Sequence, residues 1–543
     1  MVFARRSTTL LAAIIASCAM VLSLTACTSD NKTVVDGQTT VTSNSAGGVA
    51  VFTPSDGITL NQQMPLNKWA KLVPDLTKAL ADAGFKKGDI NHTTSDSLDK
   101  QSRAIQDFVV DHLSNNTTDD SGIAIAPDNM TLLVAPVVEA DASTRQYGDY
   151  VSQNLSTNDV TDEGATSDGE SSEDDSSKDD SSNTESDSTA SDEQAQAVDR
   201  LVSSLKLAKE SGMHVVLLGN SIEGYKPDAF VKFSDAQTIG KLQAEKMVSK
   251  LKLDKASKDN PKYIEVLLPC TAMDEKGNAN DSTFAQEAFR GIWQVLGSYY
   301  QKGVVESPSG TLDGKSTEND WQAVAYDAAK EGSTAKVLDK RLAKTDGQST
   351  LTRIDGIITM NDYIASEVVK ELDDLGYTGS AADINPQITI SGIVGNITGK
   401  KDLSRDAVPD PIKSPENDNA NDSSSSDDDA DEDTSASDKD RDSQWPLVTG
   451  YGAYVSNIPS IVNGKQWMTG MEDRQTIATD IAQACAKLNK DEALNSMPSI
   501  RNSEVGGVKK IPTISEPLLA VSASNLKSAL IDPGYISLAD AGL

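Results

Sequence analysis

Residue types that commonly carry catalysis or metal binding are scarce in this chain of 543 residues. Its histidines, at positions 92, 112 and 214, have spacings that fit neither a zinc site nor a Ser-His-Asp triad. The stretch Asp274–Asp281 is rich in oxygen ligands and could hold calcium, but it is better interpreted as a turn. Carboxylates are too abundant for one catalytic pair to stand out. We therefore predict that the protein is not an enzyme and needs no cofactor and no metal.

The first residues are typical of an export signal. A short cationic head precedes an apolar run, from Thr9 to Leu24, that is too brief to span a membrane stably. The run ends in Leu24-Thr-Ala-Cys27, which resembles the lipobox where bacteria attach diacylglycerol to a cysteine thiol. We predict a signal peptide over 1–26, lipidation of Cys27 and a flexible tether over 27–46. The protein would then sit in the cell envelope, lipid-anchored to the outer face of the cell membrane.

Two cysteines remain once the signal peptide and the lipidated residue are set aside. Cys270 ends a strand-like run, and Cys485 continues the apolar spacing of a helix. Two such elements in different parts of the fold would not bring their Cβ atoms within disulfide distance. We therefore expect two free thiols.

The formal net charge of -33 is concentrated in two serine-rich acidic tracts. Residues 161–193 hold 13 acidic side chains against one lysine, and residues 416–442 hold 12 against one lysine and one arginine. Because these tracts contain almost no apolar side chains, we expect disordered insertions over 152–196 and 404–444. The rest is mildly acidic and has no basic cluster, which argues against nucleic acid as a partner.

Outside the tracts, short apolar runs alternate with helical patterns. This alternation predicts an α/β fold of doubly wound parallel sheets, covered by helices on both faces. We expect strands at Ala50–Thr53, Thr131–Val137, His214–Gly219, Tyr263–Leu268, Val304–Val305, Arg353–Met360 and Gln387–Ser391. Helices are expected at Trp69–Ala83, Asp99–His112, Val198–Glu210, Phe284–Tyr299, Trp321–Lys330 and Ile364–Leu375, with a further helix after the capping box Ser234–Gln237.

Several of these segments carry a resemblance to a known family. Residues 230–244 resemble the start of the second lobe in type I periplasmic sugar-binding proteins, especially the xylose-binding and multiple-monosaccharide-binding proteins of ABC transporters. The resemblance covers most of residues 47–543 apart from the acidic tracts. It continues through Ala288–Ile292, Thr359–Asp362, Pro446–Gly450, Gly507–Pro512 and Pro533–Tyr535.

The resemblance implies two lobes joined by a three-crossing hinge, with the ligand bound between them and hinge closure on binding. Lobe one is expected to hold residues 47–225 and 472–508, and lobe two residues 226–471 and 509–543. Ligands of open α/β sheets bind beyond the carboxyl ends of strands. The candidate loops are therefore those after residues 53, 137, 218, 270, 360 and 450.

Some ligand-binding residues of the family have counterparts here. Lys68-Trp69 falls where these proteins usually carry Arg-Trp, which keeps the cation but loses the planar guanidinium. Trp321 falls where a tryptophan stacks on the sugar ring, although it could also serve only as packing. Asn361 falls where an asparagine amide reads sugar hydroxyls, although it could also act only as a helix N-cap. Asp362 follows it as a first-turn carboxylate.

Other positions depart from the family pattern. Asn220 follows Gly219 where the family has Asp-Arg, and Phe284 follows Thr283 where it has asparagine. Gly452 replaces an aspartate, and Glu472 replaces a lysine. A pyranose site needs paired polar groups, so the ligand could be larger, more apolar or cationic, and Glu472 would favour an amine.

The resemblance favours the substrate-binding lipoprotein of an ABC-type importer. Such a protein captures a small sugar or sugar-like solute and delivers it to a permease, is monomeric and contacts the membrane through its lipid anchor. Two alternatives remain open. One is a ligand-sensing protein, and the other is a non-transport surface lipoprotein with a diverged cleft.

Overall fold

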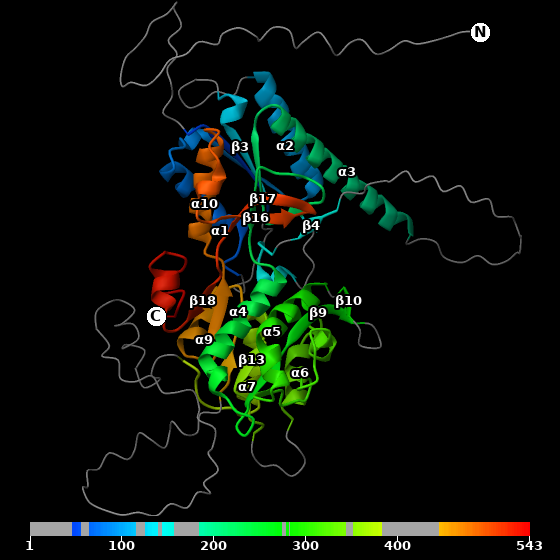
Figure 1. Cartoon of the computed structure of the whole chain (residues 1–543), viewed down its shortest axis with the longest axis vertical. Coiled ribbons are helices and arrows are strands. Elements are labelled where there is room, and N and C mark those ends of the chain that lie inside the picture. Colours follow the sequence, from blue (N-terminus) through cyan, green and yellow to red (C-terminus); the bar gives the residue numbers. More distant parts are fainter. Residues whose placement is uncertain are drawn as a thin grey trace, which may run out of the picture. The chain divides into compact units, whose positions relative to one another are not determined.

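The computed structural model describes residues 46–55, 65–115, 125–138, 144–151, 153–156, 184–273, 279–281, 283–343, 351–382 and 445–542. All of these belong to one unit of the chain, Ser45–Leu543. The predicted α/β fold is confirmed, with main sheets of mostly parallel strands (Figure 1). The signal peptide, Cys27, the tract 404–444 and the strand expected at Gln387–Ser391 lie outside the described residues.

Lobe one is built on a seven-stranded sheet. Its strands are parallel except for β16, which pairs antiparallel with β17. A short parallel pair, β4 (Asn154–Leu155) and β6 (Ser221–Ile222), adds to this lobe. The order across the main sheet is β16 (Ile500–Val505), β17 (Val508–Ser515), β7 (Ala229–Lys232), β5 (His214–Leu218), β3 (Met130–Val134), β1 (Gly48–Pro54) and β2 (Ile90–Ser95).

Helices cover both faces of this sheet because side chains alternate along each strand. On β1, Val49 and Val51 pack into one buried cluster, whereas Ala50 and Phe52 pack into another. The first cluster includes residues of α1 (Trp69–Asp82) and α10 (Arg474–Leu488), and the second includes residues of α2 (Leu98–Asn115) and α3 (Thr184–Glu210). Helices α2 and α3 pack against each other (Figure 1).

Lobe two is built on a four-stranded parallel sheet. Its strand order is β11 (Val305–Glu306), β8 (Lys262–Val266), β13 (Gly356–Ile358) and β14 (Leu447–Val448). Beside it are a sheet of β10 (Ala279–Asp281), β9 (Leu268–Met273) and β12 (Ala325–Asp327), and an antiparallel pair of β15 (Met468–Met471) and β18 (Leu519–Ser522). The helices are α4 (Ala236–Leu251), α5 (Thr283–Gln301), α6 (Ser333–Arg341), α7 (Asp362–Asp374) and α9 (Ile458–Val462), with a π-helix at Lys527–Ile531.

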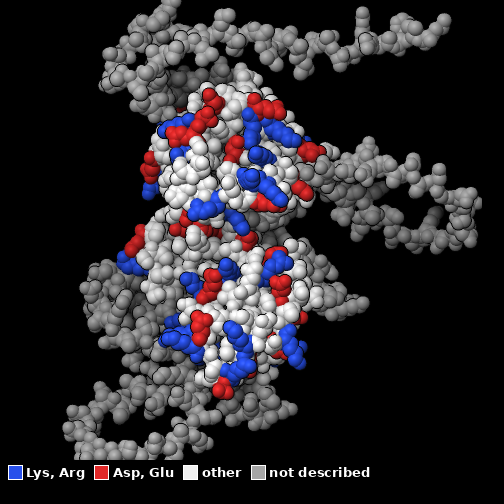
Figure 2. All heavy atoms as spheres, in the orientation of Figure 1, with Lys and Arg blue, Asp and Glu red and all other residues white. Residues whose placement is uncertain are grey.

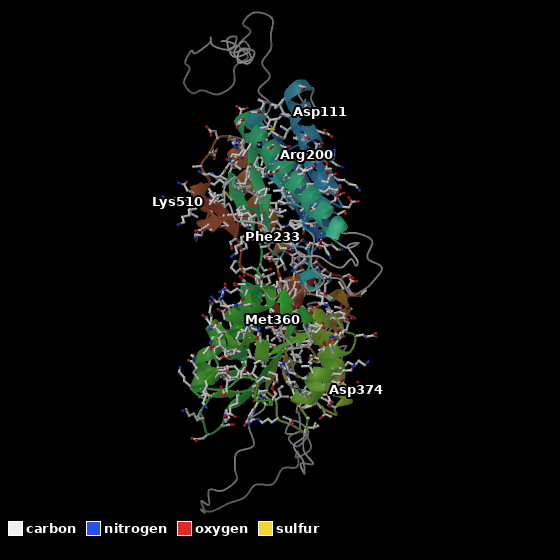
Figure 3. All side chains as sticks on the ribbon, turned by 90° about the vertical axis from the view of Figure 1, so that its right-hand side faces the viewer. Asp111, Arg200, Phe233, Met360, Asp374 and Lys510 are labelled. Carbon is white, nitrogen blue, oxygen red and sulfur yellow. The ribbon has the colours of Figure 1, made fainter. Side chains whose placement is uncertain are left out.

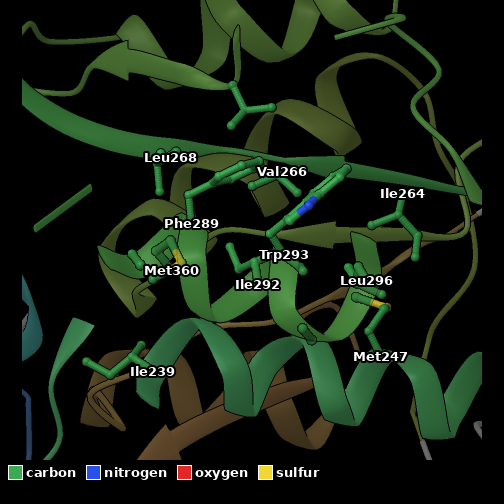
Figure 4. Close-up of a cluster of buried hydrophobic side chains, with 14 of the residues drawn as sticks. Ile239, Met247, Ile264, Val266, Leu268, Phe289, Ile292, Trp293, Leu296 and Met360 are labelled. Atoms are coloured by element: carbon green, nitrogen blue, oxygen red, sulfur yellow. The ribbon is translucent and has the colours of Figure 1, made fainter. Parts of the chain in front are cut away.

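A large buried cluster of lobe two lies between α4, α5 and β8 (Figure 4). On α5 the rings of Phe289 and Trp293 stack with centroids 5.7 Å apart. Helices α4 and α5 approach closely because Gly240 and Gly291 have no side chains. A Cβ atom at either glycine would overlap a backbone carbonyl of the other helix. These two glycines lie in segments that carry the family resemblance.

In the described part of the chain, the backbone passes between the lobes from β7 to α4, from β15 to α10 and from β17 to β18. The predicted lobe boundaries at residues 226 and 509 are wrong. Strand β7 pairs with β5 and β17 pairs with β7, so both strands belong to lobe one. Local sequence patterns do not specify which strand becomes the neighbour of another.

Three local predictions also need correction. The expected insertion 152–196 contains β4, and α3 begins at Thr184, so its ends are structured. The helix expected at Trp321–Lys330 is instead a 3-10 turn at Asp320–Ala323 followed by β12, because β12 pairs with β9. The N-cap of α4 is Asp235 rather than Ser234, since its carboxylate accepts the Thr238 N–H at 2.7 Å.

The two cysteines within the described residues are free and buried, as predicted. Cys270 packs in the core of lobe two, and Cys485 packs in a core cluster of lobe one. Burial raises the pKa of Cys270 to about 11, which keeps the thiol protonated at neutral pH.

Candidate functional site

A short stretch of chain between β3 and β4 contacts both lobes. We call residues 146–151 and 153 the bridging segment. Tyr147 and Val151 belong to the buried cluster of lobe two, whereas Tyr150 belongs to a buried cluster of lobe one. Most of the residues predicted to bind ligand contact this segment, namely Lys68, Trp69, Asn220, Phe284 and Asn361.

Lys68 and Trp69 meet the bridging segment through Asp149. The Lys68 Nζ atom lies 2.7 Å from the Asp149 Oδ1 atom, and the backbone N–H of Trp69 donates to Oδ2 at 3.1 Å. Lys68 occupies the N-cap position of α1, but its side chain forms no capping hydrogen bond. The carboxylate of Asp149 therefore serves as the cap of α1, where the helix dipole favours a negative charge.

The indole of Trp69 lies in an aromatic group at the carboxyl ends of lobe-one strands. Its ring centroid is 5.0 Å from that of Tyr150 and 5.8 Å from that of Phe233, the residue that follows β7 (Figure 3). Tyr150 in turn donates its hydroxyl to the carbonyl of Lys68. Trp69 is buried by these contacts, so its ring faces are already occupied by the chain itself.

Asn220 is placed at the end of β5 by the turn at Gly219, whose φ of +70° suits glycine. Its Oδ1 atom accepts the Gln153 N–H at 3.0 Å, and its Nδ2 atom donates to the Pro136 carbonyl at 2.9 Å. The side-chain amide thus ties the bridging segment to the loop after β3. Asn220 itself lies in the loop after residue 218, which was among the loops predicted to form the site.

Phe284 contacts the bridging segment from lobe two. Its ring centroid lies 4.6 Å from that of Tyr147, and the centroid of Tyr147 is also 6.2 Å from that of Tyr451. Tyr147 is only 1% exposed. Its hydroxyl forms no well-placed hydrogen bond within the described residues, and burial raises its pKa. Phe284 is thus covered by a tyrosine ring at the place where the resemblance expects a sugar contact.

Asn361 both caps a helix and contacts the bridging segment. Its Oδ1 atom accepts the Ile364 N–H at 2.9 Å at the start of α7, and its Nδ2 atom donates to Gln146 Oε1 at 3.0 Å. The preceding residue, Met360, has a φ of 68°, which is strained for a residue with a side chain. The two interpretations of Asn361, cap and site residue, are therefore compatible.

Asp362 is fully buried inside lobe two. Its Oδ2 atom accepts from the Tyr454 N–H at 2.9 Å and the Thr469 hydroxyl at 2.8 Å, and Oδ1 accepts from Gln466 Nε2 at 2.7 Å. Burial raises the pKa of Asp362 to about 6, although these hydrogen bonds oppose the rise. Its link to the bridging segment runs through Tyr454, whose hydroxyl donates to the Gln146 carbonyl at 2.7 Å.

Glu472 lies where the chain passes from β15 to α10. Its Oε1 atom accepts the N–H of Ser234 at 2.6 Å and the hydroxyl of Tyr451 at 3.3 Å. Ser234 belongs to another passage between the lobes, from β7 to α4, so this carboxylate connects two of them. Burial raises the pKa of Glu472 to about 7.

Trp321 is buried in the same cluster of lobe two as Tyr147. The residues of the bridging segment were not among the predicted site residues, because they lie at the edge of the first acidic tract. The signal that could have identified them is the pair Tyr147 and Tyr150 in an otherwise polar stretch. Aromatic side chains are depleted from unstructured polar segments and therefore indicate a packed site.

Neither a protein-family model nor a curated protein sequence matches this chain. One similar solved structure is that of an ABC transporter solute-binding protein from Clostridium phytofermentans with bound β-D-glucose. The sequences are 16% identical, the TM-score is 0.45, and the match covers 91% of this chain and 99% of that one. Another is a carbohydrate transporter solute-binding protein from Chloroflexus aurantiacus in complex with D-glucose, at 17% identity, a TM-score of 0.43 and coverages of 92% and 98%. An arabinose-binding protein from Geobacillus stearothermophilus is similar at 10% identity and a TM-score of 0.41, with coverages of 89% and 99%.

Proposed function

We propose that this chain is the substrate-binding lipoprotein of an ABC-type importer. It captures a small sugar or sugar-like solute between its lobes and delivers the solute to a permease. One observation carries the proposal: residues assigned to a ligand site by the resemblance converge on the bridging segment from both lobes. Asn220 follows β5 and Asn361 follows β13, and carboxyl ends of parallel strands are where open α/β sheets bind ligands.

The side chains gathered there suit a polyhydroxylated ring. The ring of Phe284 offers an apolar face, and the amide of Asn361 can donate to and accept from hydroxyl groups. The ammonium of Lys68 and the carboxylate of Asp149 add a donor and an acceptor. Because the family's bidentate groups are replaced at Asn220 and Phe284, we expect weaker discrimination among sugars than a dedicated site achieves.

The setting of this function rests on the sequence. A signal peptide over 1–26 and lipidation of Cys27 would hold a monomer at the outer face of the membrane, beside its permease. Of the helices that the structure describes, none has the length and apolar character needed to cross a membrane. Among the same residues, no group of three or more His, Cys, Asp or Glu side chains is placed to hold a metal ion.

The surface charge is consistent with a small-molecule ligand. On the face shown in Figure 2, Lys and Arg side chains are interspersed with Asp and Glu side chains over the described residues. Recognition of nucleic acid relies on a continuous basic surface that follows the phosphates. The proposal therefore includes no nucleic acid partner and no cofactor.

A second candidate function is a surface lipoprotein whose diverged site binds no solute. One observation favours it: Tyr147 already covers Phe284, and Gln146 already takes the amide donor of Asn361. The experiment below separates this candidate from solute capture.

Thermal unfolding of the full chain, measured with a panel of aldoses, polyols and amino acids, tests the proposal. A solute that binds only the folded state at about 100 times its Kd raises the free energy of unfolding by about 2.7 kcal/mol, which gives a visible rise in Tm. We expect a saturable rise with aldoses. Phe284→Ala should abolish it, because that ring contacts the proposed site.

The matched control is Tyr299→Ala on the same helix, α5. The Tyr299 side chain donates its hydroxyl to Asp254 at 2.5 Å and lies away from the bridging segment contacts. This variant should keep the sugar-dependent rise in Tm. No rise with any sugar contradicts sugar capture, and a rise that Phe284→Ala retains contradicts the location of the site.

A further inference from the structure

The place on which the predicted site residues converge is filled by the chain itself. Tyr147 ends a short 3-10 helix, Thr144–Tyr147, in the connection between β3 and β4, and side chains of such surface connections normally face solvent. Its ring is nevertheless only 1% exposed and packs against Phe284 and Tyr451. This tyrosine thus takes the aromatic surface that the proposed function reserves for a solute ring.

Hydrogen-bonding groups of the proposed solute site are also bonded to the chain itself. The Nδ2 donor of Asn361, which the proposed function directs at a solute hydroxyl, reaches Gln146 Oε1 at 3.0 Å. The hydroxyl of Tyr454 donates to the backbone carbonyl of Gln146 at 2.7 Å. One residue of the bridging segment therefore accepts hydrogen bonds from two side chains of lobe two.

The hydroxyl of Tyr147 is less well hydrogen-bonded than that of a core tyrosine in the same cluster. Tyr300 belongs to the same buried cluster and donates its hydroxyl to the Ile264 carbonyl at 2.9 Å. The Tyr147 hydroxyl is equally buried, but within the described residues no partner meets the geometry of a hydrogen bond, and the Asn361 amide only lies near enough to oppose the rise in its pKa. A buried hydroxyl without a well-placed partner costs free energy, which makes the place of Tyr147 less favourable than that of Tyr300.

We propose that Gln146 and Tyr147 are a tethered occupant of the solute site, and that a solute binds only when they leave it. This inference rests on the proposed function, because that function defines the place as a solute site. The displacing solute needs a ring face for Phe284 and an acceptor for the Asn361 amide, which a pyranose offers. If the occupant is in place about 99% of the time, the apparent affinity for solute falls about 100-fold.

The first experiment needs no solute. It compares Tyr147→Ala with Tyr300→Ala in the full chain, by thermal unfolding and by hydrogen exchange of residues 146–151. If the occupant is displaceable, Tyr147→Ala should lower Tm by less than about half as much as Tyr300→Ala does. Only Tyr300→Ala leaves a cavity in a permanent core. A displaceable occupant also predicts wild-type exchange at residues 146–151 that is much faster than in β3 and β5.

Equal losses in Tm, together with exchange at residues 146–151 as slow as in β3, overturn the proposal. Tyr147 would then be an ordinary core residue.

The second experiment titrates D-glucose and D-xylose into the wild-type chain and into Tyr147→Ala by calorimetry. Removal of the occupant should tighten binding about tenfold or more. Weaker binding by Tyr147→Ala overturns the proposal, because Tyr147 would then be a solute contact. If neither protein binds either sugar, sugar capture fails, while the Tm and exchange comparison still decides whether Gln146 and Tyr147 can leave their place.

Discussion

The two sides of the bridging segment are held by different kinds of contact. On the lobe-one side, the carboxylate of Asp149 pairs with the Lys68 ammonium at 2.7 Å and caps α1, and its backbone N–H donates to the Asn67 carbonyl at 2.8 Å. On the lobe-two side, Tyr147 and Val151 pack in the buried cluster, with the Tyr147 ring against Phe284, and Gln146 accepts two hydrogen bonds. An ion pair and a helix cap hold one side, and ring packing with neutral hydrogen bonds holds the other.

This difference indicates which lobe keeps the segment if the lobes separate. Hydrogen bonds that involve charged groups are roughly twice as strong as neutral ones. Further hydrogen bonds join Gln153 to Asn220 and to Ser221 on lobe one. We therefore expect the bridging segment to remain with lobe one and to be released from lobe two, which agrees with Gln146 and Tyr147 as the part that leaves.

The largest expected effect concerns Glu472. Its carboxylate accepts a hydrogen bond from the hydroxyl of Tyr451, whose ring lies beside that of Tyr147, and so supports the lobe-two side of the bridging segment. Burial raises the pKa of Glu472 from 4.5 to about 7, so its favourable contribution to folding is full below pH 4.5 and is lost as the pH rises through about 7. Glu472→Gln removes this dependence. The free energy of unfolding of the variant, relative to wild type, should rise by about 3 kcal/mol between about pH 4 and about pH 8.

Urea unfolding across this pH range measures the difference. The control is Glu492→Gln, because the partner Lys487 lowers the pKa of that exposed carboxyl. The control should show no gain at high pH. A pH-independent difference between Glu472→Gln and wild type would mean that the pKa of Glu472 is the same in the folded and the unfolded chain, and that this support of the lobe-two side does not depend on pH.

The second largest expected effect tests how the bridging segment is held on lobe one. Asp149→Ala removes both the ion pair with Lys68 and the cap of α1, so the free energy of unfolding should fall by about 2 kcal/mol. Hydrogen exchange of residues 146–151 should also become faster. Denaturant unfolding and exchange mass spectrometry measure the two results.

Asp96→Ala is the matched control for this prediction. The Asp96–Lys100 pair has the same 2.7 Å separation, but its side chains are 60% and 66% exposed. Exposed pairs contribute little, so the control should leave stability close to that of wild type. Similar losses in both variants would refute the stronger anchorage of the segment on lobe one.

The smallest effect separates the two roles of Asn361. Asn361→Ser keeps a side-chain cap for α7 but cannot reach Gln146, so stability should stay within about 0.5 kcal/mol of wild type while exchange at Gln146 and Tyr147 rises. Asn361→Ala loses the cap as well and should cost about 1 kcal/mol more. Unchanged exchange in Asn361→Ser would show that the contact with Gln146 does not hold the lobe-two side.

Local patterns in the sequence determined most of the elements. The apolar run at Ala50–Thr53 became β1, and the periodic stretch from Trp69 became α1, because burial on a sheet or a helix face requires these spacings. The same patterns placed Cys270 and Cys485 in separate cores and Asn220 and Asn361 at strand ends. Such features depend on residues that are close in the chain.

Only the tertiary structure decided which distant segments meet. Pairing with β9 made β12 a strand where the sequence predicted a helix, and pairing with β7 placed β17 in lobe one. The bridging segment is the clearest case, because the contact between Gln146 and Asn361 joins residues 215 positions apart. Periodicity tells which side of an element is buried, but not which partner buries it, so the chain's own occupancy of the candidate site was decided by packing alone.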